Sequence, residues 1–469
     1  MIVDYAFLFE NLGNLSQVST TALAVSITVV AIIVELAATR YSPKISDLFL
    51  RNGVNIAVMS FFIFIIVFNV WIMVPKLVPA STAIKAVVWI YLVLLTVSFV
   101  IIIPYLFFVF DFLRPESIIR SLEKSALGHL RAARRNPLHL AEARRKFLGT
   151  VEQIGDIGVK SIASMDRSLG LSCISALQRI LTHYLSVKRE YPPYWHVIES
   201  GSFYGFCHDS IARIEATKTW TEMAVLKQYE FILTTAVGSI REMVQEVSNA
   251  MGEIAASAAV ENLEESVELI VAYFNTFLRI GHNARDQYGI FNILNQYRLF
   301  AERLMERDVK RTLEIAAYFR YYGLLAVTAG LPFIMVTASS DLRVLNEKAY
   351  ERGFAGRREL LDIFLTLDKE PETAVDEIAF LGVRKSQAIL AGFYLGQGEE
   401  EQARHIWRDM LNEPPERLAA IRDEILALER ERYWEVTDRW VNFDYVPPDQ
   451  KDKIREFFNW FEDSGSVTT

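Results

Sequence analysis

Glu35 is the one charged residue in the apolar segment TALAVSITVVAIIVELAA, which runs from Thr21 to Ala38. An ionisable side chain at the depth of the lipid tails costs roughly 2.5 kcal/mol or more unless it is paired, neutral or in contact with water. We therefore expect Glu35 to face protein or a water-filled path. Two roles are open. Glu35 is either a cation or proton site, or a structural carboxylate that pairs with Arg40 or a neighbouring backbone group, or that reaches the inner membrane interface.

His183, the adjacent His208 and Asp209, and Asp286 are the best candidates for catalysis. Helical phosphohydrolases of the HD type hold metal ions with a His, a His-Asp pair and an Asp separated in this way. The surrounding segment GFCHDSIARI lacks their flanking pattern, and the chain has no Gly-rich phosphate loop, GxSxG elbow or HExxH helix. Ordinary surface or core roles are favoured, so the sequence predicts no enzyme, metal or cofactor.

Three apolar segments are long enough to cross a hydrocarbon layer of roughly 30 Å as helices. They cover about residues 21–38, 53–74 and 83–110, within a predicted transmembrane domain over residues 1–112. A fourth segment, 321–337, is borderline in length and contains Gly330 and Pro332. It could span the membrane or dip into one leaflet, but we favour a buried helix, because a span would place everything after it outside.

The positions of Lys and Arg predict the orientation, because cations beside a span resist translocation. Arg40, Lys44 and Arg51 follow the first span, Lys76 lies between the second and third, Lys85 lies at the start of the third, and nine cations lie within residues 113–150. This distribution predicts that the N-terminus is outside and that the C-terminal region is cytoplasmic.

Charge is distributed unevenly along the chain. Residues 113–150 carry nine Lys or Arg against three Asp or Glu, whereas residues 399–469 carry ten against eighteen. A basic segment directly after a span either binds anionic headgroups, with about 1 kcal/mol per well-placed cation, or is a solvated face that only sets the topology. The candidate headgroup contacts are Arg131, Arg134, Arg135, Arg144, Arg145 and Lys146. The net charge of −8 disfavours nucleic-acid binding.

Residues 26–62 resemble the signature stretch of a bacterial domain-of-unknown-function family of predicted integral membrane proteins. In that family an apolar helix ends in a Gln-Leu-Ala-Ser-Ser-like run, then Ser-Pro-Arg and Phe-Leu-Arg-Asp follow before another span. The matching residues are Glu35, Leu36, Ala37, Ala38, Thr39, Ser42, Pro43, Lys44, Phe49, Leu50, Arg51 and Asn52, and the motif loop also contains Arg40. The resemblance covers about residues 19–123. It implies a multi-pass protein of the bacterial inner membrane, without supplying a mechanism.

Helical periodicity continues through the polar region beyond Pro115. Apolar residues recur every three or four positions, as in Leu263, Val267, Ile270 and Phe274, and no strand alternation is evident. The predicted fold class is all-α, with a helical membrane domain followed by a large helical cytoplasmic region. We divide that region into residues 113–340 and 341–469.

The segment LAGFYLGQGEEEQARHIWRDMLNEPP, near the C-terminus, resembles one tetratricopeptide repeat. The offsets of a helical hairpin packed on small residues are present at Tyr394, Gly398, Ala403, Trp407, Leu411 and Pro414. One such unit cannot bury its apolar face alone, so flanking helices should stack on it. An ordinary helical hairpin is the alternative.

Two functions agree with these features. Three spans are few for a self-contained carrier, so a pore would need several copies of the chain. The first hypothesis is a homo-oligomeric, channel-like protein with a path near Glu35 that the cytoplasmic helices regulate. The second is a non-conducting, membrane-anchored scaffold or sensor that binds a partner protein through its C-terminal helical region.

Overall fold

The computed structural model describes residues 5–40, 49–73, 82–135, 139–198, 208–367, 374–432 and 439–465. These residues form helices joined by turns and short irregular segments, without a strand, which confirms the predicted all-α class. The chain divides into two compact units, residues 1–126 and 127–469. The predicted domain limits at residues 112 and 340 stay predictions.

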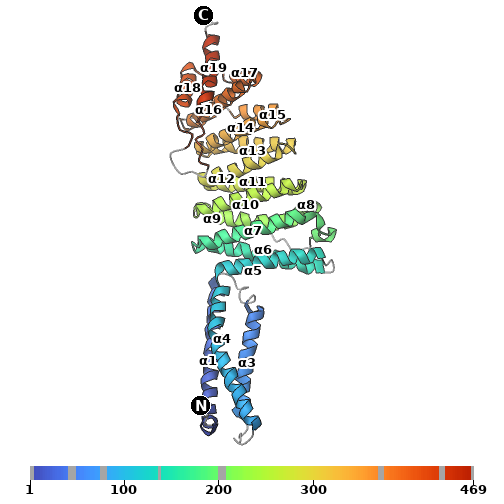
Figure 1. The fold of residues 1–469 in the computed structure, drawn as a ribbon. Helices are drawn as coiled ribbons and strands as arrows, with labels where there is room; N and C mark the ends of the chain where they lie inside the picture. The colour runs from blue at the N-terminus through green and yellow to red at the C-terminus, as the bar shows by residue number, and fades with distance from the viewer. Residues whose placement is uncertain are drawn as a thin grey trace. The chain divides into compact units, whose positions relative to one another are not determined.

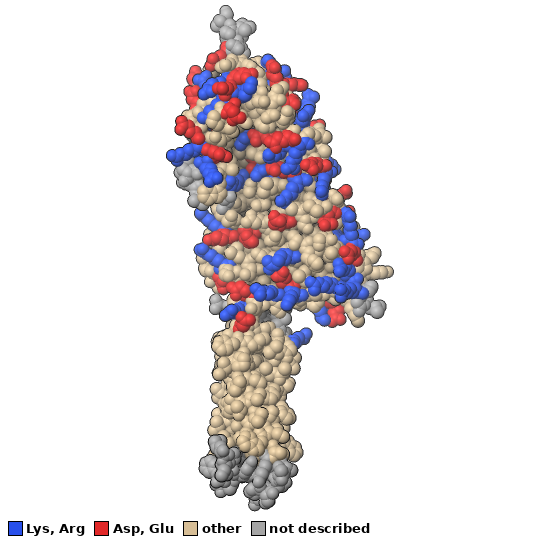
Figure 2. Space-filling view, viewed as in Figure 1, with Lys and Arg blue, Asp and Glu red and all other residues tan. Residues whose placement is uncertain are grey.

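The first unit contains three long apolar helices, α1 (Tyr5–Arg40), α3 (Gly53–Met73) and α4 (Thr82–Phe112). Each has a stretch long and apolar enough to cross a membrane, namely 13–39, 53–71 and 86–112. In the view of Figure 2 their surface is almost free of charged side chains. Three helices that are long and apolar enough to span a membrane are therefore present where the sequence predicted them.

The second unit contains most of the remaining helices, and α5 (Pro115–Arg135) extends across the boundary between the units. The others are α6 (Leu140–Ala163), α7 (Arg167–Val187), α8 (His208–Ala216), α9 (Trp220–Ala236), α10 (Arg241–Val260), α11 (Glu264–Ala284), α12 (Gln287–Leu304), α13 (Val309–Thr328), α14 (Pro332–Glu351), α15 (Arg357–Leu365), α16 (Ala374–Gly396), α17 (Glu400–Asp409), α18 (Pro415–Ala427) and α19 (Pro448–Gly465). Two short 3₁₀ helices, η2 (Lys188–Glu190) and η3 (Pro193–His196), follow α7.

The helices of the second unit stack as hairpins in chain order (Figure 1). The second helices of successive hairpins form one continuous row, α7, α10, α12, α14, α16 and α19. The first helices form a parallel row, α6, α9, α11, α13 and α15. Each hairpin buries its apolar face against its neighbours, which is the arrangement of helical-repeat proteins.

A recurrent turn connects many of these helices. In each turn a residue has a positive φ, and the N–H of the next residue donates to the carbonyl five residues before it, at 2.8 to 3.1 Å. A carbonyl group near the end of the helix thereby gains a hydrogen-bond partner. The positive-φ residues of these turns are Met165, Lys218, Asn262, Arg285, Gly330, Gly353 and Gly398. The repetition of one turn type gives the stack its regularity.

The apolar segment 321–337 is not one helix, so this prediction needs correction. α13 ends at Thr328, Gly330 has a φ of +73°, and α14 begins at Pro332. A left-handed glycine followed by a proline at the first helical position stops one helix and starts the next. The segment is the turn of a hairpin, and Tyr322, Ala326 and Ile334 within it are buried.

Candidate functional site

Glu35 lies near the C-terminal end of α1, and its side chain is exposed on the three-helix unit. The expectation that it faces protein is therefore not met within a single chain. The reason is the helical period: the buried face of α1 contains Leu23, Val30 and Val34, and Glu35 points more than a quarter turn away from it. The side chain of Arg40, its predicted partner, lies outside the described residues.

A row of polar side chains leads along α1 to Glu35. Asn14, Thr21, Thr28 and Glu35 follow one another at seven-residue intervals, which is about two helical turns, and all four are exposed. We call them the α1 polar stripe. The hydroxyls of Thr21 and Thr28 donate to backbone carbonyls four residues earlier, at 2.8 and 2.9 Å, so their oxygens remain available as acceptors.

The sequence predictions do not include the α1 polar stripe, although its spacing is visible in the sequence. Three large apolar side chains alternate with the polar ones and are just as exposed, namely Val18, Val25 and Ile32, at 62%, 57% and 52%. Spacings of three and four residues on one face are typical of helices that pack against another helix. The sequence alone does not tell which face α3 and α4 cover.

Other polar groups hold the three helices together on the opposite side of α1. Asn69 on α3 donates to the hydroxyls of Ser19 and Thr20 at 2.8 and 3.0 Å, and Ser16 shares a hydrogen bond of 2.9 Å with the hydroxyl of Tyr91 on α4. Buried hydrogen bonds of this kind are common between membrane helices. These side chains serve packing inside one chain.

Part of the motif loop is structural. Phe49 is buried, its ring meets Phe112 edge to face at 5.5 Å, and its carbonyl accepts a hydrogen bond of 3.2 Å from the Asn55 amide. Leu50 and Arg51 are exposed. The remaining loop residues of the motif, Ser42, Pro43 and Lys44, lie outside the described residues.

Arg144, predicted to contact lipid headgroups, has a structural position instead. Its guanidinium is buried and donates to the backbone carbonyls of Tyr194, at 3.3 Å, and Val197. It thereby fixes the segment after η3 against α6. Buried in this way, it is not available to a lipid surface.

The other five predicted headgroup contacts lie near the end of α5 and the start of α6. Arg134 pairs with Glu190 at 2.8 Å and Lys146 with Glu142 at 2.5 Å. The exposed cations are Arg131, Arg135, Arg145 and Lys146, and Lys146 is the one among them that forms the ion pair named above. Headgroup contact by this set stays a prediction.

Among the residues that the structure describes, the phosphohydrolase candidates do not gather into a metal site. His183 lies on α7 and Asp209 on α8, and the side chain of His208 is outside the described residues. Asp286 is the N-cap of α12, where its carboxylate accepts from the Gly289 N–H at 3.1 Å. Within the described ranges no three His, Cys, Asp or Glu side chains gather as a metal site would require.

The hairpin predicted near the C-terminus is present as α16 and α17. Gly398 lies in the turn between them with a φ of +78°, and Ala403 and Tyr394 are buried. Tyr394, Gly398 and Ala403 thus lie where the repeat offsets predict, whereas Leu411 is 44% exposed and does not pack as expected. Whether this hairpin is a tetratricopeptide repeat stays a prediction.

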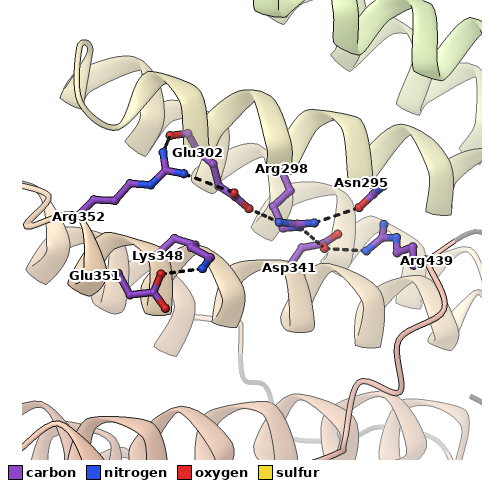
Figure 3. A network of polar contacts seen from close by, with 8 residues as sticks. All are labelled: Asn295, Arg298, Glu302, Asp341, Lys348, Glu351, Arg352 and Arg439. Carbon is purple, nitrogen blue, oxygen red and sulfur yellow. Dashed lines mark hydrogen bonds and ion pairs between the residues drawn. The ribbon is translucent and has the colours of Figure 1, made fainter. Parts of the chain in front are cut away.

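A buried charge network, which sequence reasoning did not find, joins α12 and α14 to the segment before α19 (Figure 3). Asp341 on α14 accepts from Arg298 on α12 at 3.1 Å and from Arg439 at 2.7 Å. Arg298 also pairs with Glu302, and Arg439 lies over the ring of Phe291 at 4.1 Å. The network fixes a distant part of the chain onto the helical stack.

Comparison with known proteins gives one family. Residues 14–153 match a family described as "Predicted membrane protein (DUF2254)", which confirms the resemblance found in the sequence. No curated protein matches the chain. A solved structure described as "Circular tandem repeat protein with novel repeat topology and enhanced subunit contact surfaces" is 14% identical, with 97% of this chain and 95% of that chain covered and a TM-score of 0.31. That score is too low to indicate a common fold.

Proposed function

We propose that this chain, whose residues 14–153 match a family of predicted membrane proteins, forms a homo-oligomeric, channel-like assembly. In it the α1 polar stripes of several copies line a path that cations follow. The observation that carries this proposal is the exposure of Asn14, Thr21, Thr28 and Glu35 on one face of a membrane-spanning helix.

Polar side chains in this position need a partner other than lipid. A carboxylate such as Glu35 at lipid depth costs roughly 2.5 kcal/mol or more when it is left without protein or water. Copies inserted in the same orientation place the same residue at the same depth. The assembled α1 helices therefore surround Glu35 with protein and, in the proposed path, with water. The interlocking face of Val18, Val25 and Ile32 then packs helix against helix.

The chemistry of such an assembly favours cations. Hydroxyl oxygens of Thr21 and Thr28 replace part of an ion's water shell, and a ring of Glu35 carboxylates attracts positive and repels negative ions. A carboxylate 4 Å from a cation in water contributes about 1 kcal/mol, or roughly fivefold in local occupancy. The proposed path therefore has its selective point near Glu35.

The distribution of Lys and Arg supports the proposed orientation. With the N-terminus outside, Glu35 is close to the cytoplasmic end of the first span in the bacterial inner membrane. Arg131, Arg135 and Arg145 are then the cations suited to anionic headgroups on that side. The helical stack of the second unit is the proposed regulatory region.

A second function is favoured by the stack itself. Helical repeats commonly present long surfaces for protein partners. A non-conducting scaffold or sensor, anchored by α1, α3 and α4, would use the same stack to bind a partner near α16 and α17. The channel proposal and this alternative differ in whether the purified protein conducts ions.

Ion flux in liposomes tests the proposal. The full chain should be oligomeric and pass cations, Glu35→Gln should reduce cation flux or its preference for cations about fivefold, and Thr28→Val should also reduce flux. Thr96→Val is the matched control, because Thr96 is an exposed threonine on α4 whose hydroxyl also donates to a carbonyl four residues earlier, at 2.8 Å. It should leave flux unchanged. A monomer, or a well-folded parent without flux in any ion gradient, would support the scaffold or sensor instead.

A further inference from the structure

A pocket of about 260 Å³ opens between the end of α14, the first turn of α15, and α16 and α17. Part of its lining is apolar and aromatic. Leu361 and Tyr394 are buried there, and the partly exposed Tyr350 packs on Tyr394 edge to face at 6.5 Å. The pocket can therefore cover the organic part of a small ligand, while the mouth of the pocket stays open to water.

Cations surround the mouth of this pocket. Arg357 and Arg358 come from the first turn of α15, and His405 and Arg408 come from α17. Arg357 is 4.0 Å from Glu399, and His405 is 2.9 Å from Asp362. In the described ranges of the chain, neither Arg358 nor Arg408 has an acidic side chain within ion-pair distance.

The charge balance at the pocket is positive. Glu401 is the one acidic residue in its lining, against three arginines, so the lining carries a charge of +2 when His405 is neutral. Arginines gathered around one cavity repel each other, and a bound anion removes this repulsion. The arrangement is suited to a ligand with a multiply charged head and an apolar or aromatic body.

We propose that this pocket binds a small organic phosphate. The phosphate lies between Arg358 and Arg408, and the organic part lies against Tyr350 and Tyr394. This inference does not depend on whether the membrane unit conducts ions. It adds a ligand site to the helical stack, beyond the proposed path through α1.

Guanidinium groups fit a phosphate well, because two parallel N–H donors match two of its oxygens. Arg357, Arg358 and Leu361 of the lining belong to the N-terminal part of α15, which is the end of a helix dipole that favours an anion. A monocarboxylate would neutralise only part of the charge on the lining. Phosphate is therefore the better match.

The test uses the full chain purified in detergent, with adenosine monophosphate and inorganic phosphate as probes in calorimetric titrations. Adenosine monophosphate should bind more tightly than phosphate, and Arg358→Gln or Arg408→Gln should weaken it about tenfold or more, because each removes a charge-assisted contact. Arg404→Gln is the control on the same helix. Arg404 pairs with Glu400 at 2.6 Å outside the pocket and should leave binding unchanged.

Competition by phosphatidylglycerol separates two sources of phosphate, a lipid headgroup and a free compound. The full chain is placed in nanodiscs of phosphatidylcholine, and soluble phosphatidylglycerol is added as a competitor of adenosine monophosphate. If phosphatidylglycerol competes with adenosine monophosphate and Arg408→Gln abolishes this competition, the ligand is a lipid headgroup. That outcome also supports phosphate binding at this pocket. Binding of no phosphate compound by the folded parent, or equal loss in the Arg404→Gln control, would overturn the proposal.

Discussion

Replacement of Asp341 by Asn tests whether the network of Figure 3 holds the segment before α19 in place. The carboxylate is 3% exposed and neutralises two guanidinium groups, those of Arg439 and Arg298, which are 5% and 16% exposed. The Asn side chain keeps the shape but removes the charge. Arg298 retains Glu302, so the loss falls mainly on Arg439.

The expected loss follows from burial. Two opposite charges 4 Å apart interact by about 4 kcal/mol at an effective dielectric constant of 20, and removing one partner of a buried pair typically costs 3–5 kcal/mol. Arg439 keeps its hydrogen bond to the Phe291 carbonyl and its contact with the Phe291 ring. We therefore expect Asp341→Asn to lower the local stability by about 3 kcal/mol, the lower end of that range.

Hydrogen exchange is the appropriate measurement, because helical stacks open locally and a single unfolding free energy is not defined for a two-unit chain. Exchange should accelerate in α14 and in residues 439–447. The control is Glu242→Gln. Glu242 pairs with Arg167 at 2.8 Å, but both side chains are at least half exposed, so its loss should cost about 1 kcal/mol or less.

The reasoning would be refuted if exchange in α14 and in residues 439–447 stayed within about 1 kcal/mol of the parent. It would also fail if the Glu242→Gln control had the larger effect. A double variant with Arg439→Gln should lose less than the sum of the two single changes, because the two side chains share one contact.

Burial, and after it the charge of Lys188, lowers the pKa of His196 to about 4, so its imidazole is neutral in the fold. Its contribution to stability should be complete above pH 6.5 and should decline, by at most about 1.4 kcal/mol per pH unit, as the pH falls from 6.5 to 4. His196→Gln should flatten this decline in thermal unfolding followed by tryptophan fluorescence, and an unchanged profile would contradict it. At Gly382 on α16, an added Cβ would lie 2.5 Å from a methyl of Val336 on α14, whereas at Gly396 it would meet nothing within 4 Å. Gly382→Ala should therefore be less stable than Gly396→Ala by about 1–2 kcal/mol in hydrogen exchange, and equal stability would show that the two helices can separate freely.

The sequence by itself determined which segments are long and apolar enough to span a membrane. The stretches before residue 112 that are almost free of charge are too apolar for water, and their length matches the hydrocarbon layer, so three helices follow from composition alone. Local signals also predicted the turn at Gly398, where a left-handed conformation favours glycine, and they were enough to recognise the family motif. These features depend on neighbours close in the sequence.

Only the tertiary structure decided which faces remain exposed and which distant side chains meet. The α1 polar stripe is a regular spacing in the sequence, but its exposure depends on where α3 and α4 pack. Arg439 and Phe291 are far apart along the chain, as are Tyr350 and Arg408 in the proposed phosphate pocket. Stacking of hairpins brings them together, because each hairpin buries its apolar face against the next and so fixes side chains whose proximity no local pattern encodes.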